Sequence, residues 1–210
     1  MTAAGGLDVF YPIVPDAAWA ARLVPLGVRT LQLRLKDASP SDVRRQIGEC
    51  LDLTRRYGCQ LIVNDYWQEA IAAGADYVHL GQEDLAAADV AAIKAAGIRF
   101  GISTHSEDEL EIALAAEPDY VALGPVYETK LKVMKWAPQG LTRVGEWKAR
   151  IGALPLVAIG GITPERADST ISAGADSVAV ITDFVTAQHP EQRVVSWLAW
   201  AAKRPDRVPS

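Results

Sequence analysis

Cysteine is scarce in this sequence. Only Cys50 and Cys59 occur among the 210 residues, which is too few for the disulfide framework of a small secreted domain. Neither cysteine has metal-ligand partners nearby. We therefore expect two reduced thiols in a cytoplasmic protein. The opening stretch MTAAGGLD predicts no secretory signal, because it lacks a basic region followed by an apolar run.

Long apolar runs and an excess of positive charge are also missing. No stretch approaches the length of about 20 apolar residues that spans a bilayer, so we expect no membrane association. The net charge of −5 does not favour nucleic acid or an anionic membrane as a partner. Half of the residues are hydrophobic, which is typical of a globular core. These features favour small-molecule partners, and they leave the oligomeric state open.

Short apolar runs alternate with alanine-rich, amphipathic stretches along the whole chain. Among the amphipathic stretches, Pro40–Tyr57 and Asp84–Ala96 are predicted helices. Apolar strands that alternate with helices indicate a parallel sheet covered by helices. The expected strands are residues 9–14, 30–35, 60–64, 76–81, 98–103, 119–124, 156–161 and 177–182.

A weak internal repeat indicates how these elements assemble. Four stretches share one plan, in which a helix ends and a strand begins: PLGVRTLQLR, AAGADYVHLG, AAEPDYVALG and SAGADSVAVI. They enter the second, fourth, sixth and eighth expected strands. Eight such units in one chain predict a single (β/α)8 TIM barrel over residues 1–210, with loose tails at 1–6 and about 204–210. A doubly wound open sheet is the alternative, and no G-x-G-x-x-G follows the first strand to support it.

The stretch TLQLRLKD, Thr30–Asp37, places polar side chains where a barrel interior is expected. If its three leucines face the helices, then Gln32, Arg34 and Lys36 face the interior, because side chains alternate along a strand. Two unpaired buried cations would be very costly. Either acids on other strands pair with them, or they bind a phosphate-rich ligand, for which arginine and lysine are suited.

Carboxylates end the next two expected strands. Asp65 closes VNDYW and Asp84 closes HLGQEDL, and neighbouring strands lie about 4.8 Å apart. Both side chains could therefore reach one Mg²⁺ ion, which binds through few carboxylates and keeps its waters or substrate phosphates. Helix capping is the alternative, because each aspartate precedes a helix.

A second anion site is expected on the other side of the barrel mouth. The loop GPVYETKLKVMKWAPQGL is long, as lids and binding loops are, and it carries Lys130, Lys132 and Lys135. In AIGGITPERA, Gly160 and Gly161 precede a predicted helix, and the region after the last two strands is a frequent phosphate site in barrels. Three histidines occur, and the expectations are packing for His79, a place near the site for His105 and exposure for His189.

The ordered set of motifs LQLRLKD, VNDYW, VHLGQEDL, GIST, MKWAPQGL and AIGGI resembles thiamine phosphate synthases, and the similarity runs from YPIV to VITDF. It implies a transferase of thiamine biosynthesis that requires Mg²⁺. That reaction joins 4-amino-5-hydroxymethyl-2-methylpyrimidine diphosphate to 4-methyl-5-(2-phosphoethyl)thiazole and yields thiamine phosphate and diphosphate. By this resemblance the pyrimidine diphosphate is bound by Gln32, Arg34, Lys36, Asn64, Ser103 and Lys132.

The resemblance also assigns the remaining roles. Asp65 and Asp84 would hold Mg²⁺, while Arg34, Lys36, Ser103 and Lys132 would act in catalysis by stabilising the leaving diphosphate. The residues implied at the thiazole phosphate are Thr129, Gly161, Ile181 and Thr182.

The loop after the sixth expected strand departs from the family pattern. The family commonly has P-T-x-T-K where this sequence has ETKLK, so Glu128 replaces the proline and Leu131 the second threonine. Alignment through APQGL places Lys132, and not Lys130, at the diphosphate-binding lysine. Thr182 stands where a serine is usual. A thiazole tautomerase of the same fold and a non-catalytic ligand-binding barrel are the alternative functions.

Overall fold

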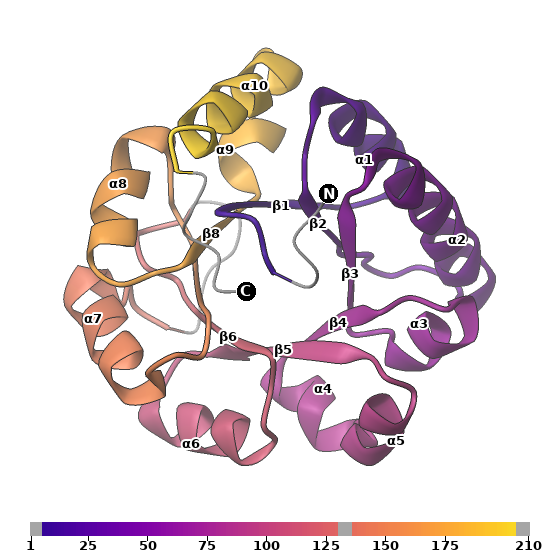
Figure 1. Ribbon diagram of the computed structural model, residues 1–210, viewed down its shortest axis with the longest axis horizontal. Coiled ribbons are helices and arrows are strands. Elements are labelled where there is room, and N and C mark those ends of the chain that lie inside the picture. The colour runs from indigo at the N-terminus through magenta and orange to yellow at the C-terminus, as the bar shows by residue number, and fades with distance from the viewer. Residues whose placement is uncertain (1–5, 130–135, 205–210) are drawn as a thin grey trace.

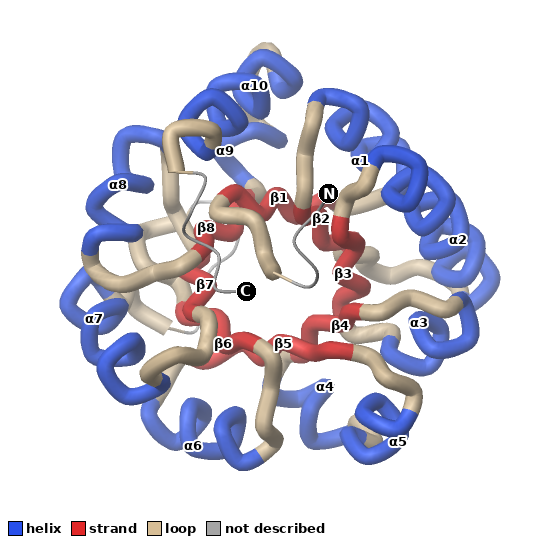
Figure 2. The backbone as a smooth tube through the Cα atoms, viewed as in Figure 1, coloured by secondary structure: helices blue, strands red, loops and turns tan. Residues whose placement is uncertain are grey.

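Eight parallel strands close into a barrel in the computed structural model, which describes residues 6–129 and 136–204. Each strand pairs with its neighbour in chain order, and β1 closes the ring by pairing with β8. The strands form an inner ring surrounded by helices (Figure 2). They are β1 (Phe10–Val14), β2 (Thr30–Leu33), β3 (Gln60–Asn64), β4 (Tyr77–Leu80), β5 (Arg99–Thr104), β6 (Tyr120–Leu123), β7 (Leu156–Ile159) and β8 (Ser177–Val180). The predicted TIM barrel is confirmed.

The helices lie outside the strands in chain order (Figure 1). α2 spans the predicted residues, because the Ser39 hydroxyl accepts from Asp42 N–H at its start and Gly58 ends it at a φ of 65°. The helices of the described residues are α1 (Ala17–Leu23), a 3₁₀ turn η1 (Val24–Leu26), α2 (Pro40–Tyr57), α3 (Trp67–Ala73), α4 (Gln82–Ala87), α5 (Val90–Ala95), α6 (Glu107–Ala115), α7 (Gly140–Ile151), α8 (Pro164–Ser172), α9 (Thr182–Val185) and α10 (Pro190–Ala201).

Several predicted elements have different boundaries in the structure, and most of the strands begin or end one or two residues inside the predicted range. The helix expected over Asp84–Ala96 is interrupted, because Ala88 is extended and the Asp89 side chain starts α5 by accepting from Ala92 N–H at 2.9 Å. The strand expected over residues 30–35 ends at Leu33. The residues expected to form loose tails lie almost wholly outside the described part of the chain.

The core has two layers, one on each side of the strands. Leu31 and Leu33 pack outward beneath the helices, whereas Tyr11, Ile62 and Tyr120 belong to a cluster inside the barrel. Burying one large apolar side chain stabilises a fold by about 1.5–3 kcal/mol, so these layers fix the ring on which the loops stand. Within the described residues, no helix combines the length and the apolar character that a membrane span requires.

Candidate active site

The predicted basic wall lies at the carboxyl end of β2. Gln32 faces the barrel interior, where its Nε2 donates to Tyr11 Oη at 2.7 Å. Arg34 is half-buried and follows the strand, and its backbone N–H donates to Val14 O at 2.9 Å. Lys36 is exposed on the loop after β2, so the prediction that it lies on the strand and faces the barrel interior is wrong. The two cations therefore stand at the barrel mouth.

Internal salt bridges do not account for these cations. Among the described residues, none of the ion pairs includes Arg34 or Lys36. The positive charge of Arg34 does act on its surroundings, because it lowers the pKa of both Asp65 and His79. The guanidinium is therefore close to the Asp65 carboxyl after β3 and to the His79 imidazole of β4, and it remains available to an anion.

Asp65 and Asp84 lie against each other at neighbouring strand ends. Asp65 follows β3, and Asp84 lies in the first turn of α4. The Asp65 backbone N–H donates to His79 O of β4 at 2.9 Å, and the negative charge of the nearby Asp84 raises the pKa of the Asp65 carboxyl. Neither aspartate is an N-cap, because Tyr66 and Gly81 hold those positions in α3 and α4. The capping alternative is wrong for both.

This carboxyl pair is electrostatically unfavourable on its own. Burial and, after it, the negative charge of Asp84 raise the pKa of Asp65 to about 6, while the positive charge of Arg34 partly opposes the rise. Asp65 also has a φ of 67°, a left-handed conformation that non-glycine residues adopt at a cost and often at functional sites. Asn64 Nδ2 donates to the Asp65 carboxylate. Such a pair suits a divalent cation.

Ser103 lies near the carboxyl end of β5, beside a buried histidine. His79 Nε2 is 2.8 Å from Ser103 Oγ. Burial and, to a lesser extent, the charge of Arg34 lower the pKa of His79 to about 3, so the imidazole is neutral. The expectation that His79 is a packed, hydrogen-bonded residue is confirmed, and its contact places it directly behind Ser103.

Glycines bring the loops after β6 and β7 together. Gly161 has a φ of 64°, and a Cβ built there would lie 2.4 Å from Glu128 O. Gly160 is equally close to Pro125, with 2.6 Å between the added Cβ and Pro125 Cα. The loop that carries Thr129 therefore crosses directly over the two glycines. These are the close-approach positions that the sequence predicted.

The end of β8 lies beside the loops after β6 and β7 and completes this half of the barrel mouth. Ile181 and Thr182 are half-buried and begin α9. Their position is fixed by Asp183, whose carboxylate accepts two hydrogen bonds from Arg193, both at 2.7 Å, and one from Trp197 Nε1 at 2.8 Å. The barrel mouth thus has a charged half over β2–β5 and a backbone-rich half over β6–β8.

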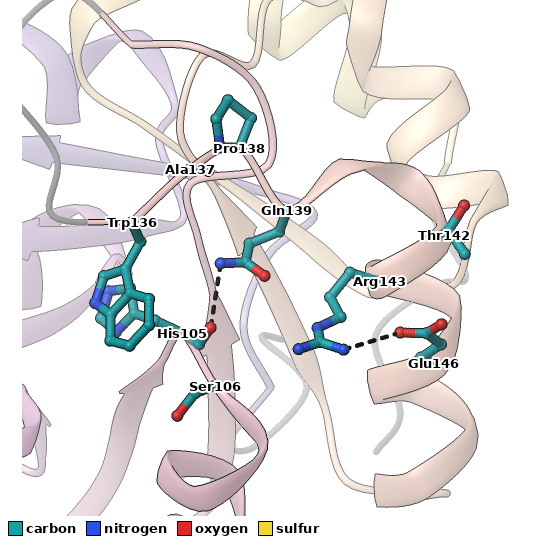
Figure 3. Close-up of a pocket in the computed structure, with 9 residues that line it drawn as sticks. All are labelled: His105, Ser106, Trp136, Ala137, Pro138, Gln139, Thr142, Arg143 and Glu146. Carbon is teal, nitrogen blue, oxygen red and sulfur yellow. Dashed lines mark hydrogen bonds and ion pairs between the residues drawn. The ribbon is translucent and has the colours of Figure 1, made fainter.

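A separate pocket of about 450 Å³ lies beside the mouth, between the end of β5 and the start of α7 (Figure 3). The His105 ring stacks on Trp136, with centroids 5.8 Å apart, and Gln139 Nε2 donates to His105 O at 3.1 Å. These contacts attach the far end of the β6–α7 loop to the end of β5. His105 accordingly supports the loop, and its Nδ1 is also bonded to Glu109 at 2.8 Å. His189 is exposed, as expected.

Three predicted lysines cannot be placed. Lys130, Lys132 and Lys135 lie outside the described residues, so the choice between Lys130 and Lys132 stays a prediction. Within the described part of the chain, no group of three or more His, Cys, Asp or Glu side chains gathers as a metal cage. A magnesium ion at the aspartate pair would complete its coordination with water and substrate oxygens.

Two tyrosines of the barrel interior were missed by sequence reasoning. Tyr11 and Tyr120 are fully buried, and their hydroxyls are bonded to Gln32 and His79 respectively. Each lies in an apolar strand, where a tyrosine is usually interpreted as a core residue with no polar role. Their alternation with outward-facing neighbours was the available indication that both point inward.

Comparisons with known proteins agree with this geometry. Residues 11–184 match the family model described as thiamine monophosphate synthase. A thiamine-phosphate synthase of Rhizobium etli is 56% identical over 196 residues, which cover 93% of this chain and 96% of that protein. One from Citrobacter koseri is 46% identical over 191 residues, covering 91% of this chain and 90% of that protein. The solved thiamine phosphate pyrophosphorylase from Pyrococcus furiosus superposes with a TM-score of 0.79 at 26% identity, covering 92% of this chain and 95% of that one. This chain belongs to the thiamine monophosphate synthase family.

Proposed function

We propose that the protein is a transferase of thiamine biosynthesis. It joins 4-amino-5-hydroxymethyl-2-methylpyrimidine diphosphate to 4-methyl-5-(2-phosphoethyl)thiazole and releases diphosphate. The observation that carries this proposal is the division of the barrel mouth. Cations, the Asp65–Asp84 pair and the Ser103 hydroxyl face one half, and the glycine-built backbone of Gly161 forms the other. This arrangement suits one substrate that releases a diphosphate and one that is held by a phosphate.

In the proposed reaction, the bond between the pyrimidine methylene carbon and the diphosphate oxygen breaks, and its electron pair leaves with the diphosphate. The thiazole nitrogen then supplies the electron pair for the new carbon–nitrogen bond. Arg34, Lys36 and Lys132 stabilise the charge that develops on the leaving oxygen, together with the Ser103 hydroxyl. The amino group on the pyrimidine ring supports a cationic methylene. No protein nucleophile takes part.

The Asp65–Asp84 pair would hold Mg²⁺. The support is electrostatic, because burial and, after it, the negative charge of Asp84 raise the pKa of Asp65 to about 6, and a bound cation would offset the repulsion between the two carboxylates. Bound there, Mg²⁺ supplies positive charge beside the diphosphate. Asn64 orients the Asp65 carboxylate through the hydrogen bond from its Nδ2. The Gln32 side-chain amide donates one hydrogen bond to the Tyr11 hydroxyl, and its carbonyl oxygen faces the pyrimidine.

The thiazole phosphate would bind over Gly161, with Thr129, Ile181 and Thr182 around it. The support is the pair of glycine-dependent loops, which bring backbone within 2.4 Å of a Cβ at position 161 and leave no room for a side chain. Backbone N–H groups and a threonine hydroxyl then receive the phosphate. We place the activity in the cytoplasm, because Cys50 and Cys59 are both buried free thiols.

A coupled assay tests the function. The purified chain, both substrates and Mg²⁺ should give thiamine phosphate and diphosphate in equal amounts, measured by chromatography and by enzymatic diphosphate detection. Omission of the thiazole phosphate, or addition of a chelator, should remove the thiamine phosphate. Isomerisation of a thiazole substrate without any diphosphate release would favour the tautomerase. Retention of both ligands without product would favour a binding protein.

A further inference from the structure

Five polar side chains form a continuous hydrogen-bonded chain across the inside of the barrel. It starts at β2, where Gln32 Nε2 donates to Tyr11 Oη at 2.7 Å, and Tyr11 Oη lies 3.0 Å from Tyr120 Oη. Tyr120 Oη lies 2.7 Å from His79 Nδ1, and His79 Nε2 lies 2.8 Å from Ser103 Oγ. The chain therefore ends at a hydroxyl of the proposed diphosphate site.

A glycine makes the central contact of this chain possible. His79 pairs with Gly101 and Gly101 with Tyr120 across three neighbouring strands. A Cβ at position 101 would lie 2.1 Å from the Tyr120 ring. The ring of Tyr120 therefore lies over Gly101 and stacks on the His79 imidazole, with centroids 5.5 Å apart and 18° between the planes. The glycine within β5 is explained by this crossing.

The donors along the chain have one consistent direction. The Gln32 amide nitrogen can only donate, so the Tyr11 hydroxyl hydrogen is directed to Tyr120, and the Tyr120 hydrogen to His79 Nδ1. The reverse direction would leave the Tyr11 hydroxyl hydrogen buried without an acceptor, and an unpaired buried polar group is unfavourable. His79 Nδ1 is thus an acceptor, and the proton of the neutral imidazole is on Nε2.

We propose that His79 is a positioning residue that holds the Ser103 hydroxyl as a hydrogen-bond donor toward the anionic substrate. His79 Nε2–H donates to Ser103 Oγ, so the Ser103 hydrogen cannot be directed to the imidazole. It is directed into the mouth, where it meets an acceptor-only anion. With the opposite tautomer, Ser103 would donate to His79 and turn lone pairs toward the diphosphate. The inference rests on the proposed function for the identity of the anion.

The tautomer can be measured on the protein alone. Nitrogen-15 labelling of the three histidines, with His105→Asn and His189→Asn variants for assignment, separates their signals in long-range proton–nitrogen spectra. We expect a pyridine-type Nδ1 and a pyrrole-type Nε2 for His79, and a loss of this single pattern in Tyr120→Phe. A pyrrole-type Nδ1 in the parent protein would overturn the proposal, whether or not the protein turns over substrate.

A double-mutant cycle tests whether the hydrogen-bonded series of side chains acts through Ser103. We expect Tyr120→Phe, which keeps the ring, to lower kcat/KM for the pyrimidine diphosphate about tenfold, as a weakened hydrogen bond to a charged group does. In a Ser103→Ala background the same change should have an effect below about twofold. Tyr77 is the matched control, because it is an interior tyrosine whose ring lies 5.8 Å from that of Tyr120. It does not belong to the hydrogen-bonded series.

The outcomes separate this inference from the proposed function. Tyr77→Phe should stay within about twofold of the parent, and KM for the thiazole phosphate should be nearly unchanged in all variants. A tenfold loss from Tyr120→Phe that persists in the Ser103→Ala background would show a structural role and refute the inference. If the parent protein has no turnover, the proposed function fails, and the tautomer measurement still decides the inference.

Discussion

Without a bound metal ion, the Asp65–Asp84 pair should make the protein less stable at neutral pH than a variant that lacks one of the two carboxylates. Asp84→Asn removes the carboxyl whose negative charge raises the pKa of Asp65, and the new amide can donate a hydrogen bond to Asp65. We therefore expect this variant to unfold at higher urea concentration than the parent protein in the presence of a chelator. The same change should abolish the stabilisation that Mg²⁺ provides.

The size of this effect follows from the pKa of Asp65. Its rise from 3.8 to about 6 corresponds to about 3 kcal/mol at 1.36 kcal/mol per unit. Asp65 is only partly buried, so solvent screening reduces this to about half. Burial is the largest cause of the rise and Asp84 comes second. Removing the Asp84 charge should therefore stabilise the metal-free protein by about 1 kcal/mol.

The gain should depend on pH in a defined direction. Asp65 has a higher pKa in the folded than in the unfolded protein, so the folded state holds its proton more tightly. That contribution is fully present below about pH 4 and is lost as the pH rises through about 6. The advantage of Asp84→Asn should accordingly be small near pH 4 and reach its full size near pH 8.

Urea unfolding at several pH values, with chelator or with Mg²⁺, measures this directly. Glu83→Gln is the matched control, because Glu83 is exposed in the same first turn of α4 and its loss removes the same favourable interaction with the helix N-terminus. Mg²⁺ should stabilise the parent and the control but not Asp84→Asn. An Asp84→Asn variant that is no more stable than the control at pH 8, or a difference that does not change with pH, would refute the reasoning.

Three further predictions concern the two anion sites. In calorimetric titrations, Arg34→Ala and Lys36→Ala should weaken binding of the pyrimidine diphosphate and leave thiazole phosphate binding nearly intact; equal loss of both would indicate a folding role. Lys132→Ala should lower kcat at least about tenfold while Lys130→Ala stays within about threefold, and the reverse order in steady-state kinetics would transfer the role to Lys130. Gly161→Ala should raise KM for the thiazole phosphate at least about tenfold, because a Cβ would meet Glu128 O at 2.4 Å and the φ of 64° disfavours it; an unchanged KM would contradict the backbone site.

The strand order could be predicted from the sequence because a (β/α)8 barrel is built from local repeats. Each strand pairs with the next one in the chain, so finding eight strands also gives their neighbours. The start of α2 was predictable for a similar reason, since Ser39 and Pro40 act within one turn. The break at Ala88 was not, because an alanine carries no local signal and the competing cap at Asp89 decides the boundary.

Contacts across the barrel could not be predicted from the sequence. The inward direction of Gln32 follows from alternation, whereas its partner Tyr11 depends on the register between β1 and β2. The bond between Tyr120 and His79 depends further on Gly101, which β5 places between them. A pairwise contact of this kind needs the relative heights of three strands, and hydrophobic patterns do not contain that information.

The two halves of the mouth bind anions by different means, and the chemistry gives a reason. A leaving diphosphate gains charge during the reaction, so groups that respond to charge, such as Arg34 and the Asp65–Asp84 pair, should affect kcat. A phosphate that only anchors its substrate keeps its charge, so a backbone site over Gly161 should affect binding alone. Buried polar side chains are tolerable between the halves because, among the described residues, no buried side-chain nitrogen or oxygen lacks a partner. The interior network can therefore hold Ser103 rigidly at the half where charge changes.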